Sequence, residues 1–191
     1  MKSVIMEQGI FSSQFARQFQ PRDSTVLARC KEGEKAAFDR LLERYRDRVL
    51  NLAFAMLHDA SAAEDIAQEV FVSAFTGIHR FRGESALFTW LYRMTLNHCH
   101  RHHQRDCSWN RNNEASCSDI STSPESTVVE RIAVKNALDT LTENQRAILI
   151  MREIHGLDYD EISRVLHIPV GTVRSRLHTA RCRFREVWKN E

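Results

Sequence analysis

The sequence is short of the two residues that break helices. Only six glycines and three prolines occur in 191 residues. Helix interiors tolerate neither residue, whereas folds rich in β-hairpins need both. Strand signals are scarce as well, because no stretch alternates strictly between apolar and polar residues with β-branched enrichment. These absences argue against a β-rich fold and predict an all-α protein.

Long apolar runs are also missing. No run approaches the roughly 20 residues that a membrane-spanning helix needs. The first 22 residues lack the apolar core of a signal peptide, since Glu7, Gln8 and Gly9 interrupt it. We therefore expect a soluble, cytoplasmic protein. Its five cysteines are then expected to be reduced, and their odd number does not suggest a disulfide framework.

The composition is that of a globular chain, with 42% hydrophobic and 27% charged residues. The length leaves room for one large domain or two small ones. Residues 106–126 hold six serines and three asparagines but almost no aliphatic side chains, which is typical of a flexible linker. We predict four parts: a tail over 1–22, a helical domain over 23–105, the linker over 106–126 and a second helical domain over 127–191.

The first domain has clear helical periodicity. From Phe38 to Met56, apolar residues recur at spacings of three and four, which predicts an amphipathic helix. Ser61 and Glu64 have the spacing of a capping box, which predicts the start of a second helix ending near Gly77. A third helix is predicted over about 85–103.

The second domain contains two short helices around a tight break. The pair Thr142 and Gln145 and the pair Asp158 and Glu161 have capping-box spacing, so each predicts a helix start. A break at 167–169 separates the second of these helices from a last one over about 170–188. This spacing predicts a helix-turn-helix from about Asp158 to Thr179.

The last helix is strongly basic. Over residues 171–189, six arginines and lysines stand against Glu186 alone, a net charge of +5. A recognition helix in the major groove presents exposed side chains near its start to base edges. Arg174, Ser175 and His178 are best placed for this role. The remaining arginines are expected to contact phosphates, which gives affinity without sequence information.

Aromatic side chains gather in the first domain around a loop and a helix start, at Phe81, Phe88, Trp90 and Tyr92. Arginines are interleaved with them or follow them, at Arg80, Arg82, Arg93, Arg101 and Arg105. Stacking aromatics beside cations are what single-stranded DNA needs. Aromatics at this spacing are also typical of a core, and composition alone favours the core interpretation.

An acidic cluster lies on the predicted helix before Gly77. It consists of Glu64, Asp65, Gln68 and Glu69, and the i, i+4 spacing places Asp65 beside Glu69. A pair of catalytic carboxylates is one interpretation, but no nucleophile or metal-binding group accompanies them. A protein-docking patch or a solvated face is favoured, and we expect no catalysis.

Histidines and cysteines are dense at the end of the first domain, at His98, Cys99, His100, His102, His103 and Cys107. His98 and His102 are spaced i, i+4 and could share a metal on one helix face. The spacing matches no zinc template, so these two are weak metal candidates. We expect no cofactor and no resident metal.

Three segments appear in order along the chain: AAEDIAQEVFVSAF at 62–75, FRGESALFTWLYRMTLN at 81–97 and LDYDEISRVLHIPVGTVRSR at 157–176. Together they resemble the bacterial extracytoplasmic-function (ECF) sigma factors of the sigma-70 family. The similarity covers about 23–105 and 127–189. Three motifs in this order, separated by a linker, make the resemblance specific.

The resemblance implies that the first domain binds and helps to melt the −10 promoter element. It assigns Asp65, Gln68 and Glu69 to docking on the clamp helices of the RNA polymerase β′ subunit. It assigns a loop to holding a flipped −10 base, formed by Phe81, Arg82, Gly83, Glu84 and Ser85. The helix that accompanies this loop would contribute Trp90, Tyr92, Arg93 and Asn97.

The resemblance also implies that the second domain reads the −35 element as duplex DNA. The implied reading positions are Thr172, Arg174, Ser175 and Arg176, followed by His178 and Thr179. Many relatives carry an aromatic and a basic residue at these last two positions. The exact −35 sequence therefore does not follow from the resemblance.

The implied function is transcription initiation from a stress- or signal-responsive set of promoters. The implied partners are core RNA polymerase through its β′ and β subunits, promoter DNA, and an anti-sigma factor, which in this family is often membrane-bound. No small-molecule substrate is implied. The alternative is a stand-alone helix-turn-helix regulator, typically a dimer on a palindromic site. That alternative leaves the acidic cluster and the aromatic loop without a role.

Overall fold

The computed structural model describes residues 23–83, 85–110 and 133–189. The predicted tail, Glu84 and most of the predicted linker lie outside these residues. Every regular element in the described ranges is helical, as predicted. The first domain consists of α2 (Asp23–Lys31), α3 (Lys35–Leu57), α4 (Ala60–Gly77), the 3₁₀ turn η2 (Ile78–Arg80) and α5 (Leu87–Asn110). The second has a helical stretch over 133–139, then α7 (Glu143–Glu153), α8 (Tyr159–Leu166) and α9 (Val170–Lys189).

The long helix α3 is the centre of the first domain and packs against both α4 and α5. Its apolar residues Phe38, Leu41, Val49 and Leu52 are all buried, which confirms the predicted amphipathic helix. Helix α4 buries a matching stripe that includes Ile66 and Val70. The opposite face of α4 is thereby left toward solvent.

Two helix boundaries differ from the prediction. Helix α4 is capped by Asp59, whose Oδ1 accepts a hydrogen bond from Ala62 N at 2.9 Å, so the capping box predicted at Ser61 is wrong. Asp59 has the extended backbone that an N-cap requires, and it precedes Ser61. Helix α5 continues to Asn110 instead of ending at 103. No glycine or proline occurs between these positions to stop it.

The second domain follows the predicted capping pattern. Capping boxes form at Thr142 with Gln145 and at Asp158 with Glu161, so both predicted helix starts are confirmed. Helix α8 ends at a left-handed His167, with φ of 55°. Only residues 167–169 separate α8 from α9, and these two helices form the predicted helix-turn-helix.

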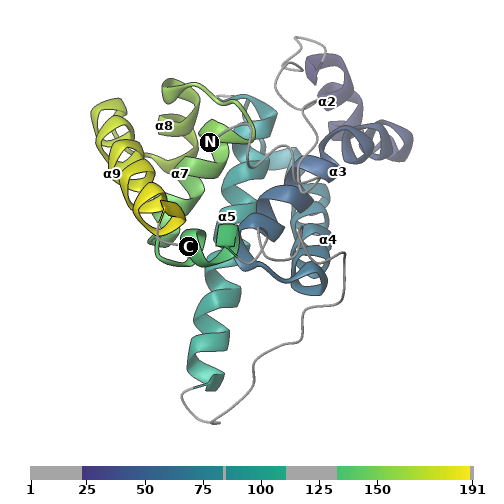
Figure 1. The fold of residues 1–191 in the computed structure, drawn as a ribbon. Helices are drawn as coiled ribbons and strands as arrows, with labels where there is room; N and C mark the ends of the chain where they lie inside the picture. Colours follow the sequence, from purple (N-terminus) through teal and green to yellow (C-terminus); the bar gives the residue numbers. More distant parts are fainter. Residues whose placement is uncertain (1–22, 84, 111–132, 190–191) are drawn as a thin grey trace.

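The two domains are packed against each other. Helix α7 contacts α3, and α8 contacts α5, so the buried residues of both domains form one continuous core cluster. Figure 1 shows α7 and α8 between α5 and the outlying α9. Among the described helices, none is both long enough and apolar enough to cross a bilayer.

Candidate nucleic-acid interface

Helix α9 divides into a buried and an exposed face. Val173, Leu177 and Ala180 are buried against the rest of the second domain. The predicted −35-reading side chains lie on the remaining surface. Arg174, Ser175, His178 and Thr179 are exposed, whereas Thr172 and Arg176 are half-buried. The fold therefore presents a polar, basic helix face near the start of α9.

Two arginines share one aromatic ring beside this face. The guanidinium carbon of Arg174 lies 5.8 Å from the centroid of the Tyr159 ring, and that of Arg152 lies 5.0 Å from it. Contacts of this kind between a cation and an aromatic face are attractive. Tyr159 thus helps to position Arg174, a role that the sequence analysis missed because the two residues lie on different helices.

Arg181 differs from the other arginines of α9. Its Nε donates to Glu153 Oε1 at 3.0 Å, and the Glu153 side chain is buried. The hydrogen bond to Glu153 raises the pKa of Arg181 above its ordinary value. Arg181 therefore ties α9 to α7. The sequence analysis expected it to contact phosphate, but of the arginines of α9 it is the least free to do so.

The predicted docking residues lie together on the solvent face of α4. Asp65, Gln68 and Glu69 are all exposed. The same face continues into two large apolar side chains, Val72 and Phe75, which are 65% and 52% exposed. Sequence reasoning missed these two, although their spacing from Asp65 and Gln68 places them along one helix face. An exposed stripe of this kind, made of five acidic, amide and apolar side chains, is suited to a protein partner.

Glu69 is held by a histidine of the neighbouring helix. His98 Nδ1 lies 2.9 Å from Glu69 Oε2, and His98 Nε2 lies 3.3 Å from Ser73 Oγ. Both ring nitrogens of this weak metal candidate therefore face groups of α4. Among the described residues, no three histidine, cysteine or acidic side chains lie close enough together to hold a metal ion.

The predicted base-holding loop contacts α5 through Phe81. Phe81 is buried, and its ring centroid lies 5.2 Å from that of Trp90. Arg82 and Gly83 are exposed, and Ser85 is half-buried. Gly83 has φ of 77°, a left-handed turn conformation that favours glycine. Glu84 lies outside the described residues.

Of the predicted −10-reading residues of α5, two contact the second domain and one is exposed. Tyr92 is fully buried, and its hydroxyl lies 2.6 Å from His155 Nδ1. Arg93 donates from Nε to the Arg164 carbonyl at 3.0 Å and to the Val165 carbonyl at 3.3 Å. Asn97 is exposed. In this arrangement Tyr92 and the half-buried Arg93 both contact the second domain.

A cleft of about 430 Å³ separates α5 from the second domain next to these contacts. Arg93, Asn97 and His100 line one side, and Glu143 and His167 belong to the other. The predicted −10-reading helix and the helix-turn-helix therefore share one cleft.

Comparison with known proteins places these features in context. Residues 41–107 match the family described as sigma-70 region 2, and residues 131–183 match the one described as sigma-70, region 4. The chain is 35% identical over 178 residues to the RNA polymerase sigma-H factor of Pseudomonas aeruginosa, which covers 85% of this chain and 91% of that protein. It is 32% identical over 174 residues to the ECF RNA polymerase sigma-E factor of Escherichia coli, covering 83% and 90%.

Solved structures share the fold. The structure of CnrH in complex with the cytosolic domain of CnrY superposes with a TM-score of 0.71 at 20% identity, covering 87% of this chain and 97% of that one. The sigma factor RpoE in complex with the anti-sigma factor NepR, from Bartonella quintana, gives a TM-score of 0.68 at 21% identity, covering 80% and 96%.

Proposed function

Because the chain belongs to the ECF sigma factors of the sigma-70 family, we propose that its two helical domains divide promoter recognition and polymerase docking between them. A sigma factor of this type is a non-catalytic protein that recognises promoters and initiates transcription with RNA polymerase. What the family does not settle is which side chains of this chain carry each contact.

We propose that the exposed face of α9 reads the −35 element. The carrying observation is that Val173 and Leu177 lock α9 into the helix-turn-helix while Arg174, Ser175 and His178 remain exposed near its start. A recognition helix enters the major groove with this part of its surface. Thr172, Arg176 and Thr179 complete the proposed surface at its edges.

Replacing Arg174 by alanine should relax sequence discrimination at one base pair. A bidentate arginine–guanine contact contributes about 1–3 kcal/mol of discrimination, which is roughly 5- to 150-fold in affinity. The measurement is fluorescence anisotropy on −35 duplexes with each base pair changed in turn. Arg185→Ala, an exposed site further along α9, is the control and should weaken binding evenly. An even loss for Arg174→Ala would reassign that residue to phosphate contact.

We propose that the acidic and apolar face of α4 docks on core RNA polymerase. The face consists of Asp65, Gln68, Glu69, Val72 and Phe75. Carboxylates and an amide around two exposed apolar side chains combine charge steering with burial, the usual composition of an interface. The β′ clamp helices are the proposed contact, and β is the proposed second contact of the chain.

We propose that the loop from Phe81 to Ser85 and the adjoining face of α5 bind the melted −10 strand. Arg82 and Gly83 are exposed, and Trp90 supports the loop through Phe81. Arg93 and Asn97 extend this surface along α5, and Tyr92 is proposed for the same face although it is fully buried in this arrangement. An unpaired base needs a pocket and stacking groups at the point of strand separation, and this domain carries the aromatic side chains for it.

Transcription with purified core polymerase tests the proposal. Start-site-specific transcripts should require the protein, and Asp65→Ala/Glu69→Ala should reduce both these transcripts and core binding. Arg174→Ala should instead lower promoter affinity while core binding is retained. If the Asp65→Ala/Glu69→Ala variant bound core polymerase normally, the docking assignment would fall.

We also propose an anti-sigma partner. Support comes from the structural neighbour RpoE of Bartonella quintana, which is complexed with the anti-sigma factor NepR. Such a partner, whether free or membrane-bound, should form a stable complex with this chain and reduce its binding to core polymerase in a competition assay. A partner that binds without reducing core binding would not be an anti-sigma factor.

A further inference from the structure

A set of polar contacts joins the two domains, and we call it the interdomain seam: Arg48, His58, Tyr92, Arg93, Asp139, Arg146 and His155. The tyrosine hydroxyl and the Nδ1 atom of His155 lie 2.6 Å apart, and both side chains are buried. Tyr92 belongs to the first domain and His155 to the second. Separating the domains therefore breaks this hydrogen bond and brings both groups into water.

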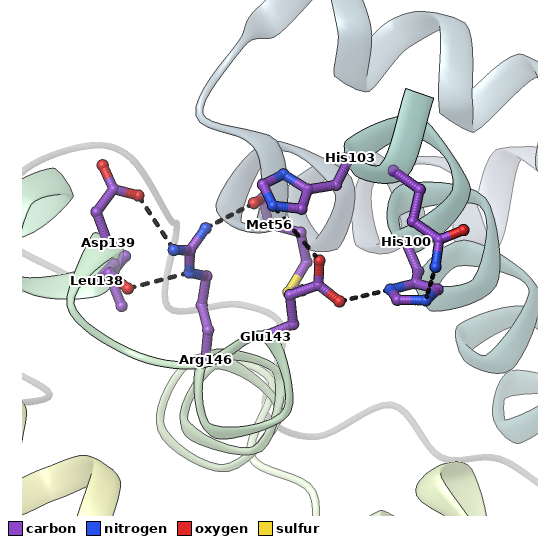
Figure 2. A network of polar contacts seen from close by, with 8 residues as sticks. Met56, His100, His103, Leu138, Asp139, Glu143 and Arg146 are labelled. Carbon is purple, nitrogen blue, oxygen red and sulfur yellow. Dashed lines mark hydrogen bonds and ion pairs between the residues drawn. The ribbon is translucent and has the colours of Figure 1, made fainter. Parts of the chain in front are cut away.

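The second part of the seam surrounds Arg146, as Figure 2 shows. Its Nη1 donates to the Met56 carbonyl of α3 at 2.9 Å, and its Nη2 lies 3.1 Å from Asp139 Oδ1. Asp139 in turn lies 3.1 Å from His58 Nδ1. His58, which follows α3, thus lies against Asp139 and near the positive charge of Arg146 in the second domain.

The seam covers one proposed DNA surface and leaves the other open. Within the seam Tyr92 is fully buried, and Arg93 donates hydrogen bonds to the carbonyls of Arg164 and Val165. Arg174 and His178 remain exposed on α9. In this arrangement the −35-reading face is accessible, whereas part of the −10-reading face is not.

We propose that the interdomain seam holds the free protein in an autoinhibited state in which α5 is covered, and that mild acid opens it. The covering of a −10-reading surface rests on the function proposed above. The seam itself and its response to acid rest only on the contacts between the domains.

The direction of the pH response follows from the surroundings of the two histidines. Burial, aided by the nearby positive charge of Arg48, lowers the pKa of His155 from 6.5 to about 3. The charge of Glu161 in α8 also acts on this group, because Glu161 interacts electrostatically with both Tyr92 and Arg48. Burial likewise lowers the pKa of His58 to about 4, with Arg146 and Lys135 lowering it further and Asp139 opposing them.

Both histidines are therefore neutral in the closed state and regain an ordinary pKa when the domains separate. Closure is fully stabilised above pH 6.5, the ordinary pKa, and loses this stabilisation as the pH falls below it. At about pH 5.5 each histidine shifts the equilibrium toward the open state about 10-fold, and the two together about 100-fold. The His100 and Glu143 side chains also meet across the two domains, with His100 Nδ1 2.6 Å from Glu143 Oε2, but this exposed pair is screened by solvent and contributes little.

Small-angle X-ray scattering of the full chain tests the seam. The radius of gyration should increase between about pH 7.5 and about pH 5.5, with unchanged helicity by circular dichroism. The variant His58→Gln/His155→Gln cannot be protonated at these sites, so its radius of gyration should be the same at both pH values. An unchanged radius for the unaltered chain, or equal expansion of the variant, would overturn the proposal.

Arg146→Ala is a second variant, since it removes a seam contact while both histidines stay in place. It should expand the chain at about pH 7.5. Arg152→Ala, which removes an arginine bound within the second domain to the Leu157 carbonyl, should leave the chain compact. A compact Arg146→Ala variant would contradict the role of the seam.

DNA binding separates the two parts of the proposal. Arg146→Ala should bind a single-stranded −10 oligonucleotide about 10-fold more tightly than the unaltered chain, and a −35 duplex within about twofold. Expansion without this gain would show that the seam exists but covers no −10-reading surface, and the assignment of Tyr92 and Arg93 would fail. No expansion would overturn the seam itself.

Discussion

Replacing Asp65 and Glu69 together by lysine should abolish transcription and weaken binding to core polymerase by about 100-fold or more. Both carboxylates are exposed on α4 beside Val72 and Phe75. Reversing two charges at the edge of an interface turns attraction into like-charge repulsion, which costs several kcal/mol. The loss should exceed that of the alanine pair, because alanine removes the attraction without adding repulsion.

The matched control lies on the neighbouring helix. Glu43 and Asp47 are exposed on α3 with the same spacing of four residues, so Glu43→Lys/Asp47→Lys changes the net charge equally. Core binding is measured by interferometry with immobilised polymerase, and −35 duplex binding by anisotropy confirms that the second domain is intact. If the control weakened core binding as much as the α4 variant, net charge would be responsible and α4 would lose its special role.

The substitution on α4 also changes an internal contact. Glu69 contacts the His98 imidazole of α5. Replacing Glu69 leaves Ser73 as the α4 residue that contacts this imidazole. Exposed pairs of this kind contribute little to stability, about 0–1 kcal/mol. The melting temperature should therefore change only slightly, and a large fall would mean that the lysine pair acts through the fold.

The helices were predictable because their signals are local. The capping boxes at Thr142 and Asp158 and the apolar periodicity of α3 depend on residues three or four positions apart. The N-cap of α4 was missed because Asp59 and Ser61 are both good capping residues, and the backbone decides between them. The end of α5 was missed because a helix without glycine or proline can continue through polar residues.

The interdomain seam could not be predicted from the sequence. Periodicity shows that Tyr92 lies on a particular helix face, but it does not show what covers that face. The partner His155 is 63 residues away in the chain, and no local pattern connects them. The aromatic and basic pattern around Arg93 suits a DNA-binding surface and an interdomain contact equally well, and the sequence analysis weighed DNA binding only against an ordinary core.

The exposed apolar residues of α4 show a different limit. Val72 and Phe75 would be counted as core by residue type alone, because large apolar side chains are usually buried. The structure leaves both more than half exposed. A helical projection centred on Asp65 and Glu69 would have placed them on the docking face. The signal was therefore present in the sequence, but the apolar character of the two side chains favoured a core assignment.

Leu177→Ala should have the largest effect on stability of any single change discussed, a loss of about 2–5 kcal/mol in the free energy of unfolding. The side chain is 1% exposed, and α9 packs against both α7 and α8. Removing most of this side chain leaves a cavity where α9 packs against α7 and α8. Urea unfolding followed by circular dichroism measures the loss, and Thr179→Ala, exposed two residues away, should change stability by less than about 0.5 kcal/mol.

The same variant tests how binding depends on the buried face of α9. Arg174 and Ser175 reach the DNA only if α9 keeps its angle to α8, and Val173 and Leu177 set that angle from the buried side. Leu177→Ala should therefore lose −35 duplex affinity even at temperatures where the chain is still folded, while core binding through α4 persists. Unchanged duplex affinity in the folded variant would mean that the short connection at 167–169 and the Tyr159 contact hold α9 without Leu177. The contact between Tyr159 and Arg174 would then be the main determinant of how this helix meets the −35 element.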